Sequence, residues 1–197
     1  MPHVPPAIDP ELLLSAYAAG IFPMAEEESG EIQWYSPDPR GILPLGSVKI
    51  SRSLRRALRK ELFTIEYDKA FESVMRQCAK RDETWISEGL IRSYTILHEM
   101  GNAHSVEAWQ GGALVGGLYG VSLGGAFFGE SMFSIVSGSS KVCLVFLVER
   151  LRERGFQLLD TQFLTPHLAS LGALEVPREE YVALLRKAIG LPVRFAD

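Results

Sequence analysis

Two acidic residues stand in stretches of sequence that are otherwise apolar or small. Glu130 lies in the middle of a strand candidate at residues 125–133, and Asp160 follows two leucines in another at 156–163. An ionised carboxylate in such surroundings is costly unless a partner compensates it. Gln162 shares a face with Asp160, because side chains alternate along a strand. The pattern favours a cation-binding pocket, although structural carboxylates satisfied by backbone donors would produce the same pattern.

A cationic stripe is the second feature that could have a chemical role. Residues 51–60 predict an amphipathic helix in which leucines recur every four residues and one side is basic. The basic side carries Arg52, Arg55, Arg56 and Arg59. Such a stripe is commonly just a solvated helix face. In a chain with a formal net charge of −4 it is also the best candidate for contacts with phosphates.

Other motifs carry weaker signals. Trp85 is an aromatic residue that could stack on a base or pack in the core. The segment Ser137 to Lys141 opens a helix, and it serves either as an anion site or as a simple N-cap. The sequence contains no Walker-type or dinucleotide glycine motif, no metal-ligand spacing and no nucleophile arrangement. It therefore predicts no cofactor and no metal.

The elements that must position these residues follow from periodicity and turn signals. Antiparallel strands are expected because Gly-Gly and Ser-Leu-Gly turns separate three consecutive strand candidates. A turn with two prolines at 36–41 marks the end of a small N-terminal unit, 1–40, ahead of a single α/β domain, 41–197. We expect helices at 11–19, 51–60, 88–100, 141–151 and 178–189, and strands at 104–109, 113–121, 125–133 and 156–163.

Composition agrees with a globular protein. Of the 197 residues, 47% are hydrophobic and 22% are charged, which suffices for one sizeable core. Cys78 and Cys143 stand in apolar stretches without metal or disulfide spacing, so buried free thiols are expected. The first 20 residues lack a basic region followed by an apolar one, and no apolar run reaches the length of a membrane span. We expect a cytoplasmic protein that does not enter a membrane.

The sequence resembles the leucyl/phenylalanyl-tRNA–protein transferase family from about residue 12 to residue 181. The resemblance rests on many separate motifs that occur in the same order. They are YAAGIFP (17–23), WYSPDPR (34–40), SRS (51–53), TWI (84–86), HSVEAW (104–109), LVGGLYG (114–120), GESMFS (129–134), SK (140–141), DTQ (160–162) and HLASLGA (167–173).

That resemblance implies a fold, a reaction and site residues. The fold would be α/β (α+β): a GNAT-like acyltransferase domain with a mixed, largely antiparallel sheet, plus a small N-terminal domain. The reaction would move leucine, phenylalanine and sometimes methionine from aminoacyl-tRNA to proteins that begin with arginine or lysine, marking them for N-end rule degradation. Asp160 and Gln162 match reaction-centre positions beside Glu130, and Trp85 matches a position near the terminal adenosine of the tRNA. An apolar pocket for the transferred side chain would be lined by Leu118, Phe127, Met132, Leu147, Leu151 and Leu159.

Two positions depart from the family pattern, and two rival functions stay open. Met24 stands where many members have tryptophan, and Ile135 stands where arginine is frequent. A CoA-dependent N-acetyltransferase would use the same fold, but the usual glycine-rich pyrophosphate loop is absent. A non-catalytic binder of basic protein N-termini would need the same acids but no arginine stripe. The transferase is the function that the sequence favours.

Overall fold

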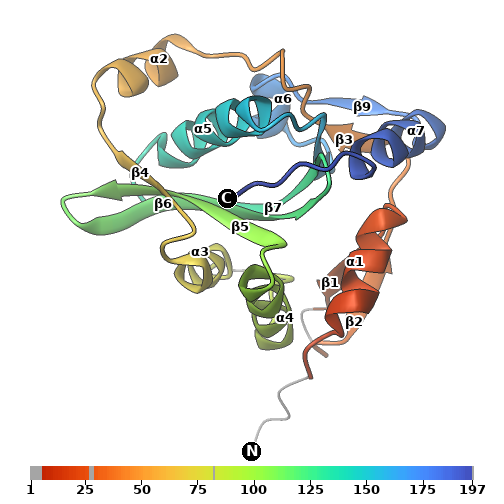
Figure 1. The fold of residues 1–197 in the computed structure, drawn as a ribbon. Coiled ribbons are helices and arrows are strands. Elements are labelled where there is room, and N and C mark those ends of the chain that lie inside the picture. Colours follow the sequence, from red (N-terminus) through yellow and green to blue (C-terminus); the bar gives the residue numbers. More distant parts are fainter. Residues whose placement is uncertain (1–5, 27–28, 82, 197) are drawn as a thin grey trace, which may run out of the picture.

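A seven-stranded sheet organises the chain in the computed structural model, which describes residues 6–26, 29–81 and 83–196 (Figure 1). All neighbouring strands pair antiparallel except β7 and β8, which pair parallel. The strand order is β4 (Thr64–Tyr67), β5 (Ala103–Gln110), β6 (Ala113–Leu123), β7 (Ala126–Ser134), β8 (Leu158–Gln162), β3 (Arg40–Ile42) and β9 (Leu174–Val176). The predicted mixed, largely antiparallel sheet is confirmed, and so is the meander of β5, β6 and β7.

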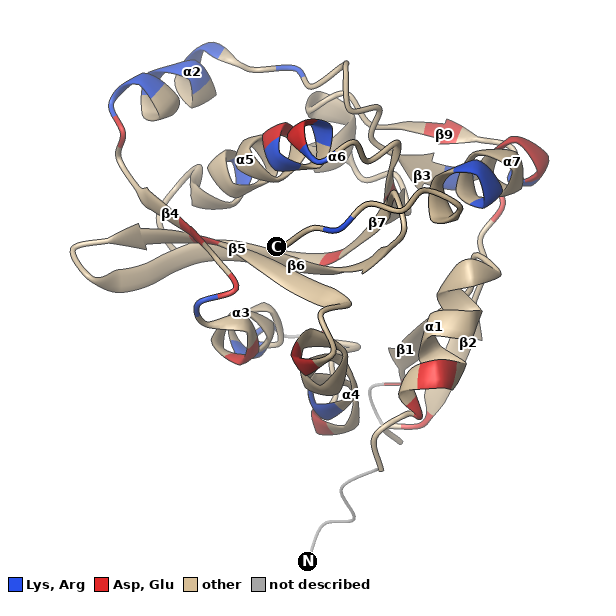
Figure 2. Ribbon diagram, in the orientation of Figure 1, with Lys and Arg blue, Asp and Glu red and all other residues tan. Residues whose placement is uncertain are grey.

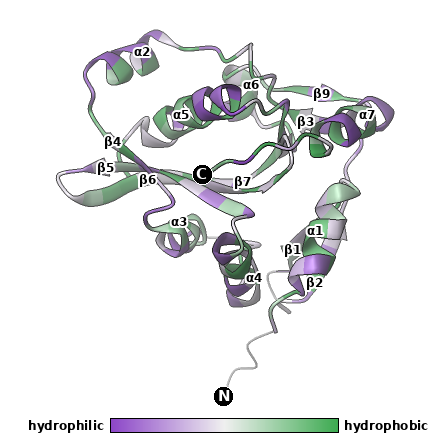
Figure 3. Ribbon diagram, in the orientation of Figure 1, coloured by the Kyte–Doolittle hydropathy of each residue, from purple (hydrophilic) through white to green (hydrophobic). Residues whose placement is uncertain are grey.

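Helices cover both faces of this sheet and define two hydrophobic cores. The first core receives buried side chains from α1 (Pro10–Ala18), α3 (Phe71–Cys78), α4 (Glu88–Glu99) and α7 (Arg178–Ile189). The second core receives them from α2 (Arg52–Arg59) and α5 (Ser139–Glu153), with α6 (Pro166–Ser170) packed against it. In Figure 3, α4 and α7 each show both colours, as expected of helices with one buried side.

Strand alternation assigns neighbouring residues to opposite cores. Phe127 belongs to the second core and Phe128 to the first, and Leu118 and Tyr119 divide in the same way. The sheet is therefore apolar on both faces at its centre. A polar group there must find its partners within the protein.

The N-terminal part packs on the first core. Asp9 caps α1 by accepting hydrogen bonds from the backbone N–H groups of Glu11 and Leu12 at 2.9 and 3.0 Å. Strands β1 (Phe22–Ala25) and β2 (Ile32–Tyr35) form a separate two-stranded sheet. The chain then enters the large sheet at β3, after a cis peptide bond between Asp38 and Pro39. A unit boundary at residue 40 stays a prediction.

The five predicted helices are all present, but shorter elements were not predicted. Helix α5 begins at Ser139, two residues before the expected start, behind Gly138 with its positive φ of 87°. Strands β1, β2, β3, β4 and β9 and helices α3 and α6 were not predicted, because segments of three to eight residues carry little periodic signal. Cys78 and Cys143 are free and buried, as expected. Within the described residues, no helix is both long and apolar enough to cross a membrane.

Candidate active site

The two parallel strands separate in the middle of the sheet. Strands β7 and β8 pair only from Ala126 with Leu158 to Phe128 with Asp160. Beyond that point a pocket of about 260 Å³ lies between them, lined on one side by residues 129–132 and on the other by residues 161–163. A gap between strands exposes backbone and side chains from both faces of a sheet. The acidic motifs of the sequence meet at this gap.

A β-bulge turns Glu130 into the site. Gly129 is the register partner of Gly120 and Ser131 is the partner of Tyr119, so Glu130 is an extra residue with no partner on β6. A bulge of this kind re-aims a side chain. The Glu130 side chain therefore meets groups of the first core, where Tyr17 and Tyr94 are fully buried.

A second irregularity lies opposite, on β8. Ile42 of β3 is the partner of Asp160 and Gly41 is the partner of Gln162, which leaves Thr161 unpaired on that side. Gln162 has a positive φ of 58°, an uncommon conformation for a side chain of this kind. Its backbone N–H donates to the Asp160 carboxylate at 2.8 Å. Asp160 thus stabilises the backbone conformation that places Gln162 at the pocket.

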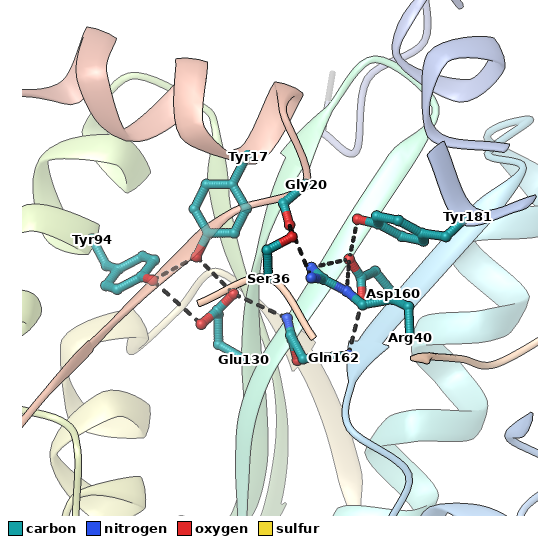
Figure 4. A network of polar contacts seen from close by, with 9 residues as sticks. All are labelled: Tyr17, Gly20, Ser36, Arg40, Tyr94, Glu130, Asp160, Gln162 and Tyr181. Atoms are coloured by element: carbon teal, nitrogen blue, oxygen red, sulfur yellow. Dashed lines mark hydrogen bonds and ion pairs between the residues drawn. The ribbon is translucent and has the colours of Figure 1, made fainter. Parts of the chain in front are cut away.

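Glu130 is held by neutral donors (Figure 4). Its carboxylate accepts hydrogen bonds from the Tyr17 hydroxyl at 2.7 Å, from the Tyr94 hydroxyl at 3.3 Å and from the Gln162 amide at 3.3 Å. The two tyrosine hydroxyls also lie 2.5 Å from each other. Burial raises the pKa of Glu130 to about 7, and the hydrogen bonds from the tyrosines oppose that rise. This carboxyl group therefore titrates near neutral pH.

Asp160 is held by a cation of the protein itself. The Arg40 guanidinium donates to both carboxylate oxygens, with the shortest contact at 2.8 Å, and both side chains are essentially inaccessible to solvent. The Tyr181 hydroxyl adds a hydrogen bond at 2.6 Å. Together with the backbone N–H of Gln162 these donors occupy the acceptor sites of the Asp160 carboxylate. The sequence predicted a cation-binding pocket around the two acids, and the cation that Asp160 binds is Arg40 of the protein itself.

Arg40 also ties the N-terminal part of the chain to the site. One guanidinium nitrogen donates to the Gly20 carbonyl oxygen at 2.9 Å, just beyond the end of α1. The guanidinium carbon lies 4.6 Å from the centroid of the Tyr181 ring and 4.9 Å from that of Phe22, within range of a cation–π interaction. Neither Arg40 nor the three tyrosines were predicted as site residues. Arg40 and Tyr17 lie within the family motifs WYSPDPR and YAAGIFP, but nothing local in those motifs indicates that their side chains meet the acids.

The pocket is apolar toward the second core and polar toward the first. The predicted residues Leu118, Met132, Leu147 and Leu159 line it, joined by Leu144 and Leu168. Trp85, also predicted, lines the other side near Glu130, Gln162 and the unpredicted Arg81, and Phe22 and Met24 bring the N-terminal part to the same wall. The structure thus brings most of the predicted set to one cavity.

Two predicted pocket residues lie elsewhere. Phe127 and Leu151 are fully buried in the second core and are not part of the pocket wall. Phe127 packs against Phe195 near the C-terminus, with ring centroids 5.4 Å apart. The correction has a simple cause: apolar residues on the correct face of β7 and on α5 are equally suited to a wall and to the core behind it.

The arginine stripe is exposed on α2, which Figure 2 shows as a basic helix at the edge of the molecule. Arg52, Arg55, Arg56 and Arg59 are all exposed, while Leu54 on the opposite side is buried. In the described part of the chain none of the four forms an ion pair with a carboxylate. The stripe therefore presents four free positive charges, outside the pocket and not part of its lining.

The arrangement of the sheet defines a class of fold. A mixed, largely antiparallel sheet that opens between two parallel strands is the GNAT-like fold. The solved structure of FemX has a similar fold, with a TM-score of 0.51 at 14% sequence identity over 89% of this chain and 70% of that chain.

Comparison with known families narrows this class. The family model described as leucyl/phenylalanyl-tRNA protein transferase matches residues 42–186, and the model of its N-terminal domain matches residues 7–38. Leucyl/phenylalanyl-tRNA–protein transferases from Herpetosiphon aurantiacus and Gloeobacter violaceus are 57% and 56% identical to this chain, covering 95% of it in each case and 98% and 97% of their own lengths. The chain belongs to the leucyl/phenylalanyl-tRNA–protein transferase family.

Proposed function

We propose that this protein transfers leucine or phenylalanine from aminoacyl-tRNA to the N-terminal arginine or lysine of acceptor proteins, which marks them for degradation by the N-end rule pathway. Membership of the family supports the reaction. The observation that carries the proposal is the pocket between β7 and β8, which combines apolar lining residues with Glu130 and Gln162. The preference for arginine or lysine follows from the family resemblance.

The apolar side of the pocket suits the transferred side chain. Leucine and phenylalanine fill a cavity lined by leucines and methionine without needing a polar partner. One methylene in such a cavity changes discrimination by about 1 to 3 kcal/mol. We expect valine and isoleucine to be poor donors, since they branch at Cβ where the side chain enters.

Glu130 is suited to the acceptor amine. A free α-amino group has a pKa of about 8, close to the pKa of about 7 to which burial raises Glu130. The carboxylate accepts one proton from the ammonium, which leaves a neutral amine. The amine then attacks the ester carbonyl carbon; the C–N bond forms, the C–O bond to the ribose breaks, and the ribose oxygen leaves with the second amine proton. The ester is already activated, so the reaction needs no ATP.

Gln162 and Asp160 have different parts in this scheme. Gln162 donates to Glu130 at 3.3 Å and lines the same pocket, and in this proposal its amide orients the amine toward the ester. Asp160 touches no substrate. It is a positioning residue that holds the backbone of Gln162 while Arg40 neutralises its charge.

One assay tests the proposed reaction. The purified protein is mixed with a peptide that begins with arginine, and with phenylalanyl-tRNA, leucyl-tRNA, valyl-tRNA or acetyl-CoA. We expect peptide extension with the first two donors, little with valyl-tRNA and none with acetyl-CoA. A peptide whose N-terminus is acetylated is the matched control. Acetylation of the free peptide, or binding without any product, would contradict the proposal.

The exposed arginines of α2 are proposed to contact the phosphates of the tRNA. Each phosphate contact adds roughly 0.7 to 0.9 to the slope of log affinity against log salt. Replacing Arg52, Arg55, Arg56 and Arg59 by glutamine should weaken tRNA binding and flatten this slope. Transfer from a minimal phenylalanyl-adenosine ester should not change. An unaltered slope would show that these arginines are an ordinary solvated surface and do not contact tRNA phosphates.

A further inference from the structure

Arg81 holds a fixed positive charge at the pocket. It follows α3 in a short segment that leads to Trp85, and both side chains line the cavity. Its Nε donates to the Cys78 carbonyl oxygen at 2.9 Å, and one terminal nitrogen donates to the Ser131 hydroxyl at 2.9 Å and to the Met132 carbonyl at 3.3 Å. These bonds tie an otherwise flexible side chain to both α3 and β7.

All of these acceptors are neutral. Within the part of the chain that the structure describes, no carboxylate lies within ion-pair distance of the Arg81 guanidinium. Arg76, in the preceding helix turn, shows the contrast, since it forms ion pairs with both Glu72 and Glu88. A guanidinium that is oriented but not neutralised is a typical partner for a phosphate.

The position of Arg81 limits which anion it can meet. Ser131 directly follows Glu130 on β7, and one strand residue advances about 3.3 Å. Because Arg81 is bonded to Ser131, we estimate that its guanidinium is separated from the Glu130 carboxylate by roughly the length of one nucleoside. The first peptide bonds of an acceptor carry no charge. The phosphodiester on the 5′ side of the terminal adenosine is the one anion that comes this close to the ester in every productive complex.

We propose that Arg81 binds this last phosphodiester of the donor and so sets the distance between the terminal nucleoside and Glu130. The proposal rests on the proposed function, because it assumes an aminoacyl ester of a 3′-terminal adenosine as donor. It assigns to Arg81 a binding role that is independent of the arginines of α2, which lie outside the pocket.

The test uses two small donors that differ in one group. They are 3′-O-phenylalanyl-adenosine and the same ester carrying a 5′-(methyl phosphate), which reproduces the phosphodiester. In wild-type protein we expect a higher kcat/KM for the phosphorylated ester. Arg81→Gln should lower that value by about 10- to 100-fold, the range for one lost charge-assisted contact, and should change the value for the ester without the phosphate by less than about twofold. Lys80→Gln removes the adjacent exposed charge and is the matched control.

The outcomes separate the two proposals. Equal losses on both esters would show that Arg81 acts on the fold or on the reaction centre, and no loss on either would show that it binds nothing; each result overturns the phosphate contact. Transfer from phenylalanyl-tRNA by the wild-type protein tests the proposed function alone. Absence of that transfer would overturn the proposed function. An Arg81→Gln variant that affects both esters equally would overturn only the phosphate contact.

Discussion

Two clusters of buried polar groups lie at different strands of the sheet, one at β5 and one at β7 and β8, and the acids at their centres have different surroundings. In the β5 cluster, Glu107 is completely buried and accepts hydrogen bonds from the Ala70 backbone N–H at 2.7 Å, the Ser105 hydroxyl at 2.8 Å and the Trp109 ring N–H at 3.0 Å. None of these residues borders the pocket. In the β7–β8 cluster, formed by Tyr17, Arg40, Tyr94, Glu130, Asp160, Gln162 and Tyr181, Glu130 forms part of the pocket wall.

The difference lies in the space beside the acid and in the origin of its donors. Glu107 receives two of its three donors from Ser105 and Trp109 of its own strand, and it does not border the pocket, so we interpret it as a structural carboxylate. Glu130 receives them from α1, α4 and β8, three elements far apart in the sequence. Burial alone does not identify a reactive acid. A buried acid becomes a candidate when it adjoins a cavity and depends on distant elements for its orientation.

Breaking the ion pair of the β7–β8 cluster should have the largest effect. Arg40→Leu leaves Asp160 buried without a counter-charge, and we expect the free energy of unfolding to fall by about 3 to 5 kcal/mol. Urea denaturation measures this loss. The double variant Arg40→Leu, Asp160→Leu should recover much of the stability. It should not recover the transfer activity, because the backbone N–H of Gln162 loses the carboxylate that accepts its hydrogen bond. If the single variant Arg40→Leu were as stable as the wild type, the role of Arg40 as the counter-charge of Asp160 would be contradicted.

Exchanging each acid for its amide tests the comparison directly. Glu130→Gln should lower transfer by about 10²- to 10⁴-fold in a folded protein, because it removes the carboxylate that we propose as the acceptor of the amine proton. Glu107→Gln should do the reverse, costing about 2 kcal/mol of stability while transfer by the folded protein stays within about twofold. Peptide extension and urea denaturation are measured on both variants. Comparable activity losses in the two would refute the division of roles.

The pH dependence of stability sharpens the same contrast. The pKa of Glu130 is raised from 4.5 to about 7 in the folded protein, so between these values the folded state binds more protons than the unfolded state. The free energy of unfolding should therefore decrease as pH rises through this window, by on the order of 3 kcal/mol, and stay low above it. Glu130→Gln should remove this decrease and be the more stable protein at pH 8. Glu107→Gln should keep it; parallel curves for wild type and Glu130→Gln between pH 4.5 and 8 would show that the carboxyl is not perturbed.

The smallest effect is expected from Tyr181. Tyr181→Phe removes one hydrogen bond to Asp160 but leaves the Arg40 ion pair intact. We expect a loss of about 1 kcal/mol in stability and a modest loss of transfer, both measured against wild type. The corresponding change at Tyr17 should reduce transfer more strongly than stability, since Tyr17 bonds to Glu130 rather than to Asp160. If the two variants lost stability and transfer activity in the same proportion, the proposed difference in role between Glu130 and Asp160 would be contradicted.

Local sequence was sufficient to predict the long elements and the family, and it singled out the two acids of the candidate site. Periodicity is sufficient for a 12-residue helix such as α4, and glycine pairs are sufficient for the turns of the meander. Glu130, Asp160 and Gln162 stood out because carboxylates and amides are unusual in apolar strands. Most of the residues predicted to line an apolar pocket do line one, since the face of a strand follows from alternation.

Only the tertiary structure distinguishes the surroundings of the two acids. The sequence treats Glu130 and Asp160 alike, but a bulge turns Glu130 toward the pocket, while Arg40, 120 residues away along the chain, neutralises Asp160. The same limit applies to Phe127 and Leu151, because alternation fixes a face but not the depth beneath it. Pairings across such distances and small shifts in strand register depend on how the elements pack, which no local pattern encodes.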